Sequence, residues 1–439
     1  DRERQERGPR GALHGIPVLL KDNLETGDRM ATTAGSLALA GSVAARDSFV
    51  AERLRGAGCV LLGKANLSEW ANFRSSRSTS GWSGVGGQTR NPYALDRNPC
   101  GSSSGSGASV AASLCAAAIG TETDGSVVCP ANANGIVGIK PTLGLVSRAG
   151  IVPLAHSQDT AGTMGRTVAD ATAMLTAIAG ADSRDDATAA SAQHPADFAA
   201  FLLQDGLQGA RLGVARNYTG FHEKCEALLE DALAAMRSAG ARVIDPIELP
   251  NRGDYGDAEY EVLLYEFKAD LNNYLAQRPS VQVKSLADLI DFNRSLADAE
   301  MPYFQQEVFE EAQEKGDLTE APYQEALEKC KRLAGTEGID AALKKDGLDA
   351  IVAITGGPAW LTDLVIGDHF LGGCSQPAAV AGYPHVTVPM GYVFGLPVNI
   401  SFLSTAWSEP TLIRIAYAFE QLTQHRQAPR FLQTVNLNA

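Results

Sequence analysis

The sequence has 439 residues, of which 45% are hydrophobic and 20% are charged. This composition is typical of a globular protein with a sizeable core and excludes a disordered chain. The net charge of −14 opposes binding to nucleic acid or to an anionic membrane through a general basic surface. At this length we expect one large α/β domain with a subdomain, or two domains.

The seven cysteines contain no CxxC pair, and the seven histidines form no HxxxH or HExxH motif. We therefore expect no disulfide framework and no zinc site, with Cys100, Cys115 and Cys129 acting as small buried residues. The least polar long run, 108–120, is too short to span a bilayer. No signal peptide is visible, which favours the cytoplasm, but the chain starts at Asp1, so export of a processed protein stays open.

In chain order, the first apolar run is GIPVLL at 15–20, which predicts a buried strand that ends at Lys21. A helix, a glycine and an apolar strand follow one another at 48–63, and the same order returns at 224–248. This alternation predicts αβ units on a largely parallel sheet. Residues 71–98 lack periodicity and run into a Gly/Ser loop, which favours a functional segment.

The second half of the chain adds strands and one long helical region. Residues 258–345 are charged and mostly helical in pattern, and they predict a helical layer or lid over an edge of the sheet. Helices are also expected at 166–180 and 409–424. Further strands are predicted at 136–139, 143–146, 350–354, 385–388 and 399–402.

The stretch 99–130 carries a Gly/Ser turn at each end, and we predict one short helix between the two turns. Glycine lets the backbone approach a ligand closely and serine supplies hydroxyl groups, so this stretch is our candidate active site. Ser126 ends the second turn, where successive backbone N–H groups can hold an oxyanion. A tight turn with an incidental serine is the alternative.

Two further features bear on the chemistry. GSSSG at 101–105 fits the nucleophile elbow G-x-S-x-G, which would make Ser103 the nucleophile, with a histidine as its base. That motif requires an apolar strand directly before it, and the preceding residues are polar and include two prolines. Lys21 closes a buried strand, where desolvation can lower its pKa and make it a base for serine, although such a lysine often just reaches solvent.

Together these segments resemble the amidase signature family, and within it the peptide amidase branch. GIPVLLKDN at 15–23, CGSSSGSGAS at 100–109 and GTETDGSVVCPA at 120–131 match its lysine strand, Gly/Ser loop and nucleophile turn. The family's two serines are 24 residues apart, and the same step from Ser126 selects Ser102 among three adjacent serines.

The nucleophile turn departs from the common family pattern in three places. Glu122 stands for an aspartate, Asp124 for a glycine and Val128 for an arginine. The peptide amidase branch shares this form, so the resemblance still implies activity. The roles of the family's aspartate and arginine do not carry over to this chain.

The resemblance implies a fold and a reaction. The fold is α/β: a single amidase signature domain over 1–439, with a large mixed, mostly parallel twisted sheet, helices on both faces and 258–345 as an inserted helical layer or lid. The reaction is the hydrolysis of a C-terminal peptide amide or a similar small amide by a serine-dependent amidase. Aryl-acylamides, esters or carbamates are alternative substrates, and an esterase using Ser103, a transamidase subunit or a silent binding protein are alternative functions.

The resemblance also assigns the site residues. Ser126 is the nucleophile, Lys21 is the base, and Ser102, after a cis peptide bond, bridges them. No metal or cofactor is implied, and we expect a small amide or peptide substrate, neither nucleic acid nor membrane as partner, and a monomer or homodimer. The oxyanion hole consists of the backbone N–H groups of Thr123, Asp124, Gly125 and Ser126. The substrate pocket is lined by Ala71, Asn72 and Phe73, with further walls from 258–345 and 355–375.

Overall fold

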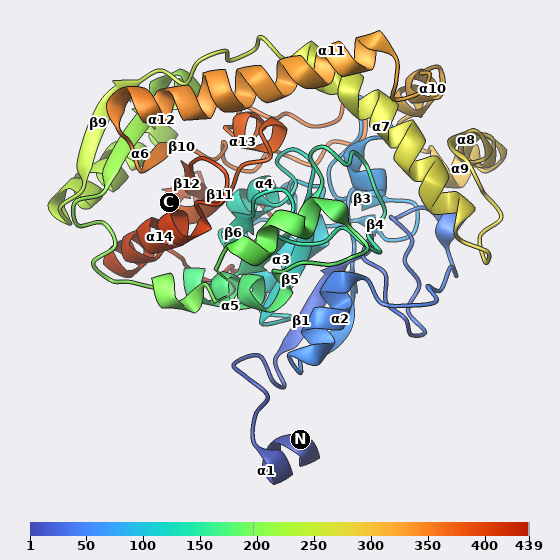
Figure 1. Cartoon of the computed structure of the whole chain (residues 1–439), viewed down its shortest axis with the longest axis horizontal. Helices are drawn as coiled ribbons and strands as arrows, with labels where there is room; N and C mark the ends of the chain where they lie inside the picture. Colours follow the sequence, from blue (N-terminus) through green and yellow to red (C-terminus); the bar gives the residue numbers. More distant parts are fainter. Residues whose placement is uncertain (196, 438–439) are drawn as a thin grey trace.

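A ten-stranded mixed sheet forms the centre of the molecule (Figure 1). The structure is a computed structural model that describes residues 1–195 and 197–437. The strand order is β2-β1-β5-β7-β6-β11-β12-β10-β8-β9, which confirms the predicted large mixed sheet. In chain order the strands are β1 (Pro17–Lys21), β2 (Val60–Ala65), β5 (Ala117–Glu122), β6 (Val137–Lys140), β7 (Thr160–Gly165), β8 (Arg211–Ala215), β9 (Arg242–Ile247), β10 (Ala350–Ile354), β11 (His385–Val393) and β12 (Leu396–Leu403).

The two ends of the sheet pair in parallel, and its centre is antiparallel. At one end β1 lies between β2 and β5, and at the other β8 lies between β10 and β9. The predicted helix–strand units are present as α2 (Phe49–Gly56) with β2 and α6 (Glu223–Ser238) with β9. A separate small hairpin joins β3 (Trp82–Ser83) to β4 (Gly87–Gln88).

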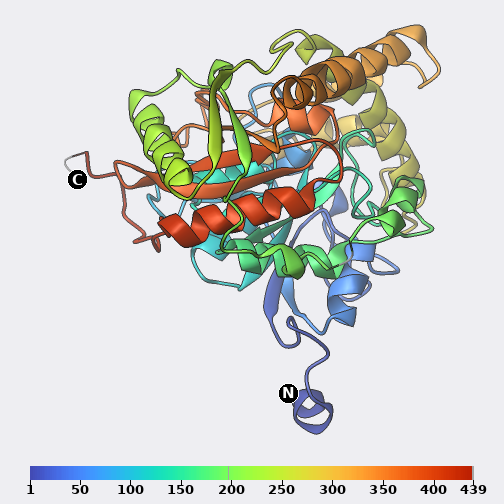
Figure 2. The same ribbon diagram turned by 60° about the vertical axis from the view of Figure 1, so that its left-hand side comes forward.

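Helices cover both faces of the sheet, because successive strand side chains point to opposite sides. In β5, Ala117 and Ile119 belong to the core cluster that includes α2, α5, α6 and α14. Ala118 belongs instead to the cluster that includes α3 and α4. Figure 2 shows α14 lying along one face of the sheet. The remaining bounds here are α3 (Ser104–Ala111), α4 (Val128–Ala133), α5 (Val168–Ile178) and α14 (Glu409–Thr423).

The region 258–345 consists of helices in the structure, and Figure 1 shows α7 and the α11–α12 rod lying along one side of the molecule. A π-helical stretch, η6 (Lys331–Ile339), joins α11 to α12. A short helix, α13 (Gln376–Val380), packs beneath η6. The helices of the region are α7 (Gly256–Ala276), α8 (Leu286–Ser295), α9 (Ala297–Glu300), α10 (Glu307–Gln313), α11 (Ala321–Cys330) and α12 (Asp340–Asp346).

Two predicted elements are wrong. The expected strand at 143–146 is a turn, since Gly144 has φ +85° and breaks the extended backbone. The stretch 99–130 holds α3 and then β5 in place of a single helix joining the two turns. Alanine and glycine, which dominate the start of β5, are poor strand formers, so no strand pattern was visible there.

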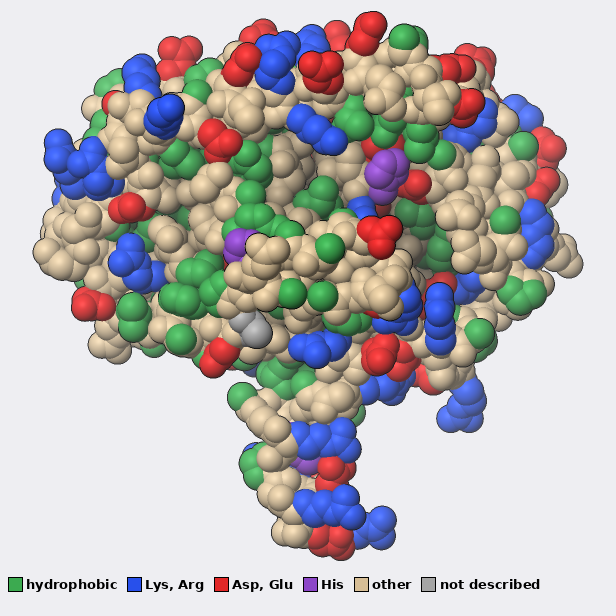
Figure 3. All heavy atoms as spheres, viewed as in Figure 1, with side chains coloured by type: hydrophobic (Ala, Val, Ile, Leu, Met, Phe, Trp, Pro, Cys, Tyr) green, Lys and Arg blue, Asp and Glu red, His purple; other side chains and the backbone are tan. Residues whose placement is uncertain are grey.

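The face of the molecule seen in Figure 3 carries charges of both signs. Figure 3 shows lysines, arginines and acidic side chains interspersed over the visible face, with the N-terminal segment projecting from the body. Within the described ranges, every helix is too short or too polar to cross a bilayer.

The packing of α14 onto β12 generates a stability prediction. Phe419 is fully buried and lies 6.0 Å from Phe402, centroid to centroid. Replacing Phe419 by alanine leaves a cavity, and we expect the free energy of unfolding to fall by about 3–5 kcal/mol. Leu422, 47% exposed on the same helix, is the control, and Leu422→Ala should stay within about 0.5 kcal/mol. Urea titrations of both variants measure the difference, and equal losses would contradict this packing.

Candidate active site

The site lies where two neighbouring strands end. β1 and β5 run in parallel with Leu20 paired to Ile119, so their carboxyl ends share one edge of the sheet. Lys21 is the last residue of β1, and the turn that carries Ser126 follows β5. Ser102 reaches the same place from the loop before α3. The structure therefore brings Lys21 and Ser102 into contact and places the turn of Ser126 beside the Ser102 loop.

The Lys21 amine is fully buried and has three oxygen neighbours. Its Nζ atom lies 2.7 Å from Ser102 Oγ, 2.9 Å from Thr121 Oγ1 and 3.1 Å from the Thr121 carbonyl oxygen. Burial lowers the pKa of Lys21 to about 7, against the opposing effect of Asp159 and Glu122. A neutral amine has two N–H groups and one lone pair, so it can donate to both Thr121 oxygens and accept from the Ser102 hydroxyl.

The backbone holds Ser102 on two sides. The Gly101–Ser102 peptide bond is cis, as the resemblance implied. The Ser102 carbonyl accepts from Ser68 N at 3.0 Å, and the next residue, Ser103, donates its N–H to the Ser126 carbonyl at 3.2 Å. The two serine-bearing turns are thus in direct backbone contact.

Glu122 organises the turn of Ser126. Its Oε2 atom accepts from Val127 N at 2.7 Å and from Val128 N at 3.0 Å, at the start of α4. Those N–H groups have no partner within the helix, and a carboxylate at a helix N-terminus is favourable. Sequence reasoning left Glu122 without a role, and the structure gives it this one.

A second set of contacts fixes Thr123. Its hydroxyl donates to Asp159 Oδ1 at 2.5 Å, and its carbonyl accepts from Gln158 Nε2 at 3.2 Å. The same Gln158 amide group donates to Glu259 Oε1 of α7 at 3.0 Å. Gln158 therefore connects the predicted oxyanion turn to the helical region above it. No sequence signal pointed to Gln158 individually.

A cavity of about 490 Å³ adjoins the site between α7 and the loop 148–160. It reaches Asn23, Thr121 and Thr123, and Ala71 borders it as predicted, whereas Ser102, Ser126, Asn72, Phe73 and the segment 355–375 are not among its lining residues. The segment 355–375 does not border this cavity, but its Ser375 lies beside the turn of Ser126, next to Asp124 and Gly125, so the wall expected from it stays a prediction. The residues that α7 contributes are Asp270, Asn273 and Tyr274.

The other two predicted pocket residues, Asn72 and Phe73, directly follow Ala71 in the chain. The Phe73 ring packs edge-on against Phe267 of α7, with 5.3 Å between ring centroids. Ala71 and Asn72 have φ of +56° and +72°, in the left-handed region that side chains rarely adopt. The left-handed backbone at Ala71 and Asn72 bends the chain before Phe73, whose ring packs on α7.

The nucleophile-elbow interpretation of Ser103 is wrong. Its hydroxyl donates to the Thr121 carbonyl at 3.0 Å and accepts from Thr121 N at 3.2 Å, so the backbone uses it fully. Within the described residues no strand directly precedes it. The buried His385 faces Ser401 at 2.6 Å, and His156 contacts Asp270 at 2.9 Å, so both histidines have other partners.

One side-chain cluster has the composition of a metal site. His156, Glu266 and Asp270 bring their ligand atoms close together beside the cavity. The three side chains already bind one another: Asp270 and Glu266 contact the two nitrogens of the His156 ring, and Glu266 also accepts from Tyr323. The Asp270 carboxylate raises the pKa of His156. The contacts fit an ion-pair cluster that docks α7 onto the loop.

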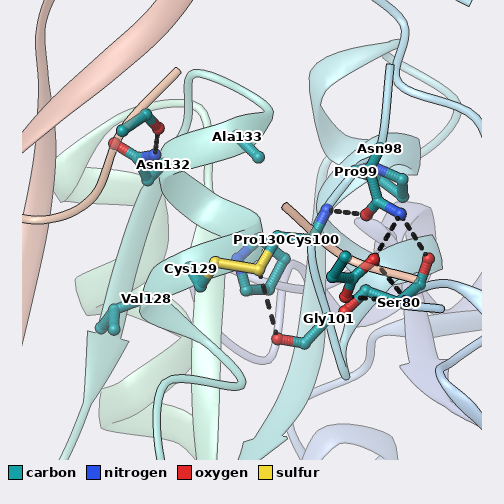
Figure 4. Close-up of a disulfide and its surroundings, with 12 residues drawn as sticks. Ser80, Asn98, Pro99, Cys100, Gly101, Val128, Cys129, Pro130, Asn132 and Ala133 are labelled. Atoms are coloured by element: carbon teal, nitrogen blue, oxygen red, sulfur yellow. Dashed lines mark hydrogen bonds between the residues drawn. A yellow bond between two sulfur atoms is a disulfide. The ribbon is translucent and has the colours of Figure 1, made fainter. Parts of the chain in front are cut away.

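The expectation of free cysteines at the site is wrong for two of the three. Cys100 and Cys129 form a disulfide, while Cys115 is free and buried. Figure 4 shows the bond linking the loop before Gly101 to helix α4. The absence of CxxC pairs gave no sign of it, because the two residues are 29 positions apart and only the fold brings them together.

Comparisons with known proteins agree with this geometry. The profile of the Amidase family matches residues 1–413. The chain belongs to the amidase signature family. A peptide amidase from Stenotrophomonas maltophilia superposes with a TM-score of 0.93 at 52% identity, over 98% of this chain and 87% of that one.

Curated relatives extend the family match to other organisms. A probable amidase of Arabidopsis thaliana is 44% identical over 96% of this amidase and 79% of its own length. A glutamyl-tRNA(Gln) amidotransferase subunit of Symbiobacterium thermophilum is 35% identical over 95% of this chain and 85% of its own. The protein is thus an enzyme that hydrolyses amides, and its fold is the amidase signature fold.

The role of Glu122 is testable. Glu122→Ala leaves the buried N–H groups of Val127 and Val128 without an acceptor, so we expect a loss of about 2–4 kcal/mol in unfolding free energy. Glu122→Gln keeps one acceptor oxygen and should lose about 1 kcal/mol. Denaturant titrations measure both values. Equal stability of the alanine variant and the unchanged enzyme would exclude this capping role.

Proposed function

We propose that the amidase hydrolyses its substrate through Lys21, Ser102 and Ser126, with Ser126 as the nucleophile. The observation that carries the proposal is the buried amine of Lys21 at 2.7 Å from Ser102 Oγ, with its pKa lowered to about 7. With a pKa of about 7, a substantial fraction of the amine is neutral at neutral pH and can act as a base. A Lys base with Ser nucleophile replaces the Ser-His-Asp arrangement in other enzymes.

In the proposed mechanism the proton moves along the three residues. Neutral Lys21 takes the proton of the Ser102 hydroxyl, Ser102 takes that of Ser126, and Ser126 Oγ attacks the amide carbonyl carbon. The proton returns to the nitrogen as the C–N bond breaks and the amine leaves. Water then hydrolyses the acyl-enzyme ester by the same route.

The turn 123–126 is the proposed oxyanion hole. The N–H groups of Thr123, Asp124, Gly125 and Ser126 follow one another there, and Gly125 has φ +75°. Such a left-handed residue within a turn lets successive N–H groups converge on one point. The contacts of Thr123 to Asp159 and Gln158 support it, since a preorganised hole stabilises the transition state most.

The proposed substrate is a C-terminal peptide amide or a similar small amide. The likeness to peptide amidases at 52–53% identity supports it, as does a cavity in the size range of small-ligand sites. We propose that the segment Ala71, Asn72 and Phe73 forms one side of the substrate site, of which Ala71 borders the cavity, and that 258–345 acts as the lid of a single domain, because α7 borders the same cavity.

Other acyl groups are alternatives with the same chemistry. Hydrolysis of aryl-acylamides, esters or carbamates uses the same catalytic steps, and the residues that line the substrate pocket decide among these substrates. A transamidase subunit has weaker support, because the solved glutamyl-tRNA(Gln) amidotransferase subunit of Thermotoga maritima is 28% identical, against 53% for a peptide amidase. We propose an enzyme that acts alone, as a monomer or homodimer.

A substrate panel tests the proposal. Purified enzyme is assayed with peptide amides, aryl-acylamides, alkyl esters and carbamates, each matched in acyl group, and kcat/KM is compared. The proposal expects the highest value for peptide amides. A preference for carbamates or aryl-acylamides would overturn the substrate class and leave the mechanism standing.

Alanine variants distinguish Ser126 from Ser103 as the nucleophile. Ser126→Ala removes the attacking oxygen, and we expect kcat to fall by about 10⁴–10⁶-fold. Ser103→Ala removes only a contact to the Thr121 backbone and should retain most of the activity. Labelling by a serine-directed fluorophosphonate, read by mass spectrometry, should modify Ser126. Loss of labelling in Ser103→Ala with retention in Ser126→Ala would reverse the assignment.

The Lys21 assignment predicts a pH profile. The lysine is active as the neutral amine, and its pKa is lowered to about 7, so kcat/KM should rise with pH below about 7 and level off above it. The slope approaches tenfold per pH unit on the acid side. Lys21→Ala should lower kcat by several orders of magnitude at neutral pH. A profile that is flat between pH 5 and 8 would contradict a lysine base.

A further inference from the structure

The disulfide connects the two catalytic turns and nothing else. Cys100 lies two residues before Ser102, and Cys129 lies three residues after Ser126, in the first turn of α4. The two Cα atoms are 5.9 Å apart. The covalent link therefore bypasses α3 and β5, the elements that separate the two serines along the chain.

Both ends of the link are firmly held. Cys100 N donates to Asn98 Oδ1 at 2.8 Å, and the Asn98 amide donates to Ser80 O at 3.0 Å (Figure 4). On the other side, Cys129 N donates to the Gly125 carbonyl at 2.8 Å, directly beside Ser126. A displacement at either sulfur is thus transmitted to a catalytic turn.

The noncovalent links between the turns are few among the described contacts. Ser103 N donates to the Ser126 carbonyl at 3.2 Å, a long hydrogen bond. Asn134 at the end of α4 donates to the Pro99 carbonyl at 2.9 Å. Ser103 Oγ also bonds to the Thr121 carbonyl and to Thr121 N at the end of β5. None of these bonds involves Ser102 itself, and the disulfide is the covalent member of the set of links that fixes the separation of Ser102 from Ser126.

We propose that Cys100 and Cys129 are positioning residues for catalysis: their disulfide holds Ser102 in register with Ser126, and full turnover depends on it. The inference rests on the proposed roles of the two serines. Proton transfer depends steeply on distance, and a misplacement of about 1 Å can cost about 100-fold in rate. A dithiol reagent reduces the Cys100–Cys129 disulfide by supplying two electrons and two protons. The two cysteines become thiols, and the reagent becomes a disulfide.

The disulfide also bears on the cellular compartment in which the enzyme is active. Disulfides persist in oxidising compartments and are rare in the reducing cytosol. A disulfide that supports turnover therefore favours an exported or otherwise oxidising location over the cytoplasm that the sequence favoured. The other cysteines that the structure describes are free: Cys59, Cys115, Cys225, Cys330 and Cys374.

The experiment reduces the folded enzyme and separates kcat from KM. Enzyme treated with dithiothreitol is assayed on a peptide amide, and thiol titration after denaturation should rise from five to seven per chain. We expect kcat to fall about 10–100-fold with KM unchanged within about twofold. The C100S/C129S variant should show the same low kcat and no response to the reductant. Cys115→Ser, from the same stretch, is the control and should behave like the unchanged enzyme.

A substrate-independent readout keeps the two proposals apart. The rate of Ser126 labelling by a fluorophosphonate should fall on reduction, even if no peptide amide is turned over. Slower labelling together with no turnover of any peptide amide would contradict the proposed substrate class and would still support the positioning role of the disulfide. The positioning role would be overturned if kcat and the rate of Ser126 labelling stay unchanged in the enzyme whose seven thiols are all titrated, or in the C100S/C129S variant. Loss of the near-ultraviolet circular dichroism on reduction would also overturn it and assign the disulfide to global stability.

Discussion

The site depends on the burial of one amine. Lys21 has no access to solvent, and the ammonium form has lost its hydration. Burial lowers its pKa to about 7, and the three oxygen neighbours from Thr121 and Ser102 satisfy its hydrogen bonds. Both neighbours are placed by the sheet: Thr121 lies on β5, which pairs with β1 in parallel, and Ser102 precedes the helix that packs on β5. The position of the proposed base is therefore a consequence of strand pairing.

The helical region is fixed to the site through one face of α7. Glu259, Glu266 and Asp270 are seven and four residues apart, which puts them on one side of the helix. They accept from Gln158 Nε2, Ser157 N and His156 N, three successive residues of one loop. Because Gln158 also holds Thr123 and the next residue, Asp159, accepts from the Thr123 hydroxyl, the position of α7 and the shape of the turn are linked.

Much of the site could be predicted from the sequence, and the rest depends on the fold. Two features can be read directly from the sequence: the spacing of 24 residues between Ser102 and Ser126, and the lysine at the end of an apolar run. The partner of Lys21 on β5, Thr121, follows from strand pairing, which no local pattern records. The disulfide was missed for the same reason, since its spacing of 29 residues suits many folds. β5 itself was hidden because a fully buried strand built from small residues lacks alternation.

Asp124 shows how the turn tolerates an acid where the family pattern has glycine. An ionised carboxylate on the turn would repel the negative charge that develops on the substrate oxygen. Burial and the nearby Glu259 carboxylate raise the pKa of Asp124 well above its usual range, so the neutral acid is favoured. Burial raises the pKa of Glu259 as well. Through Glu259, α7 therefore contributes to the electrostatics of the turn as well as to its shape.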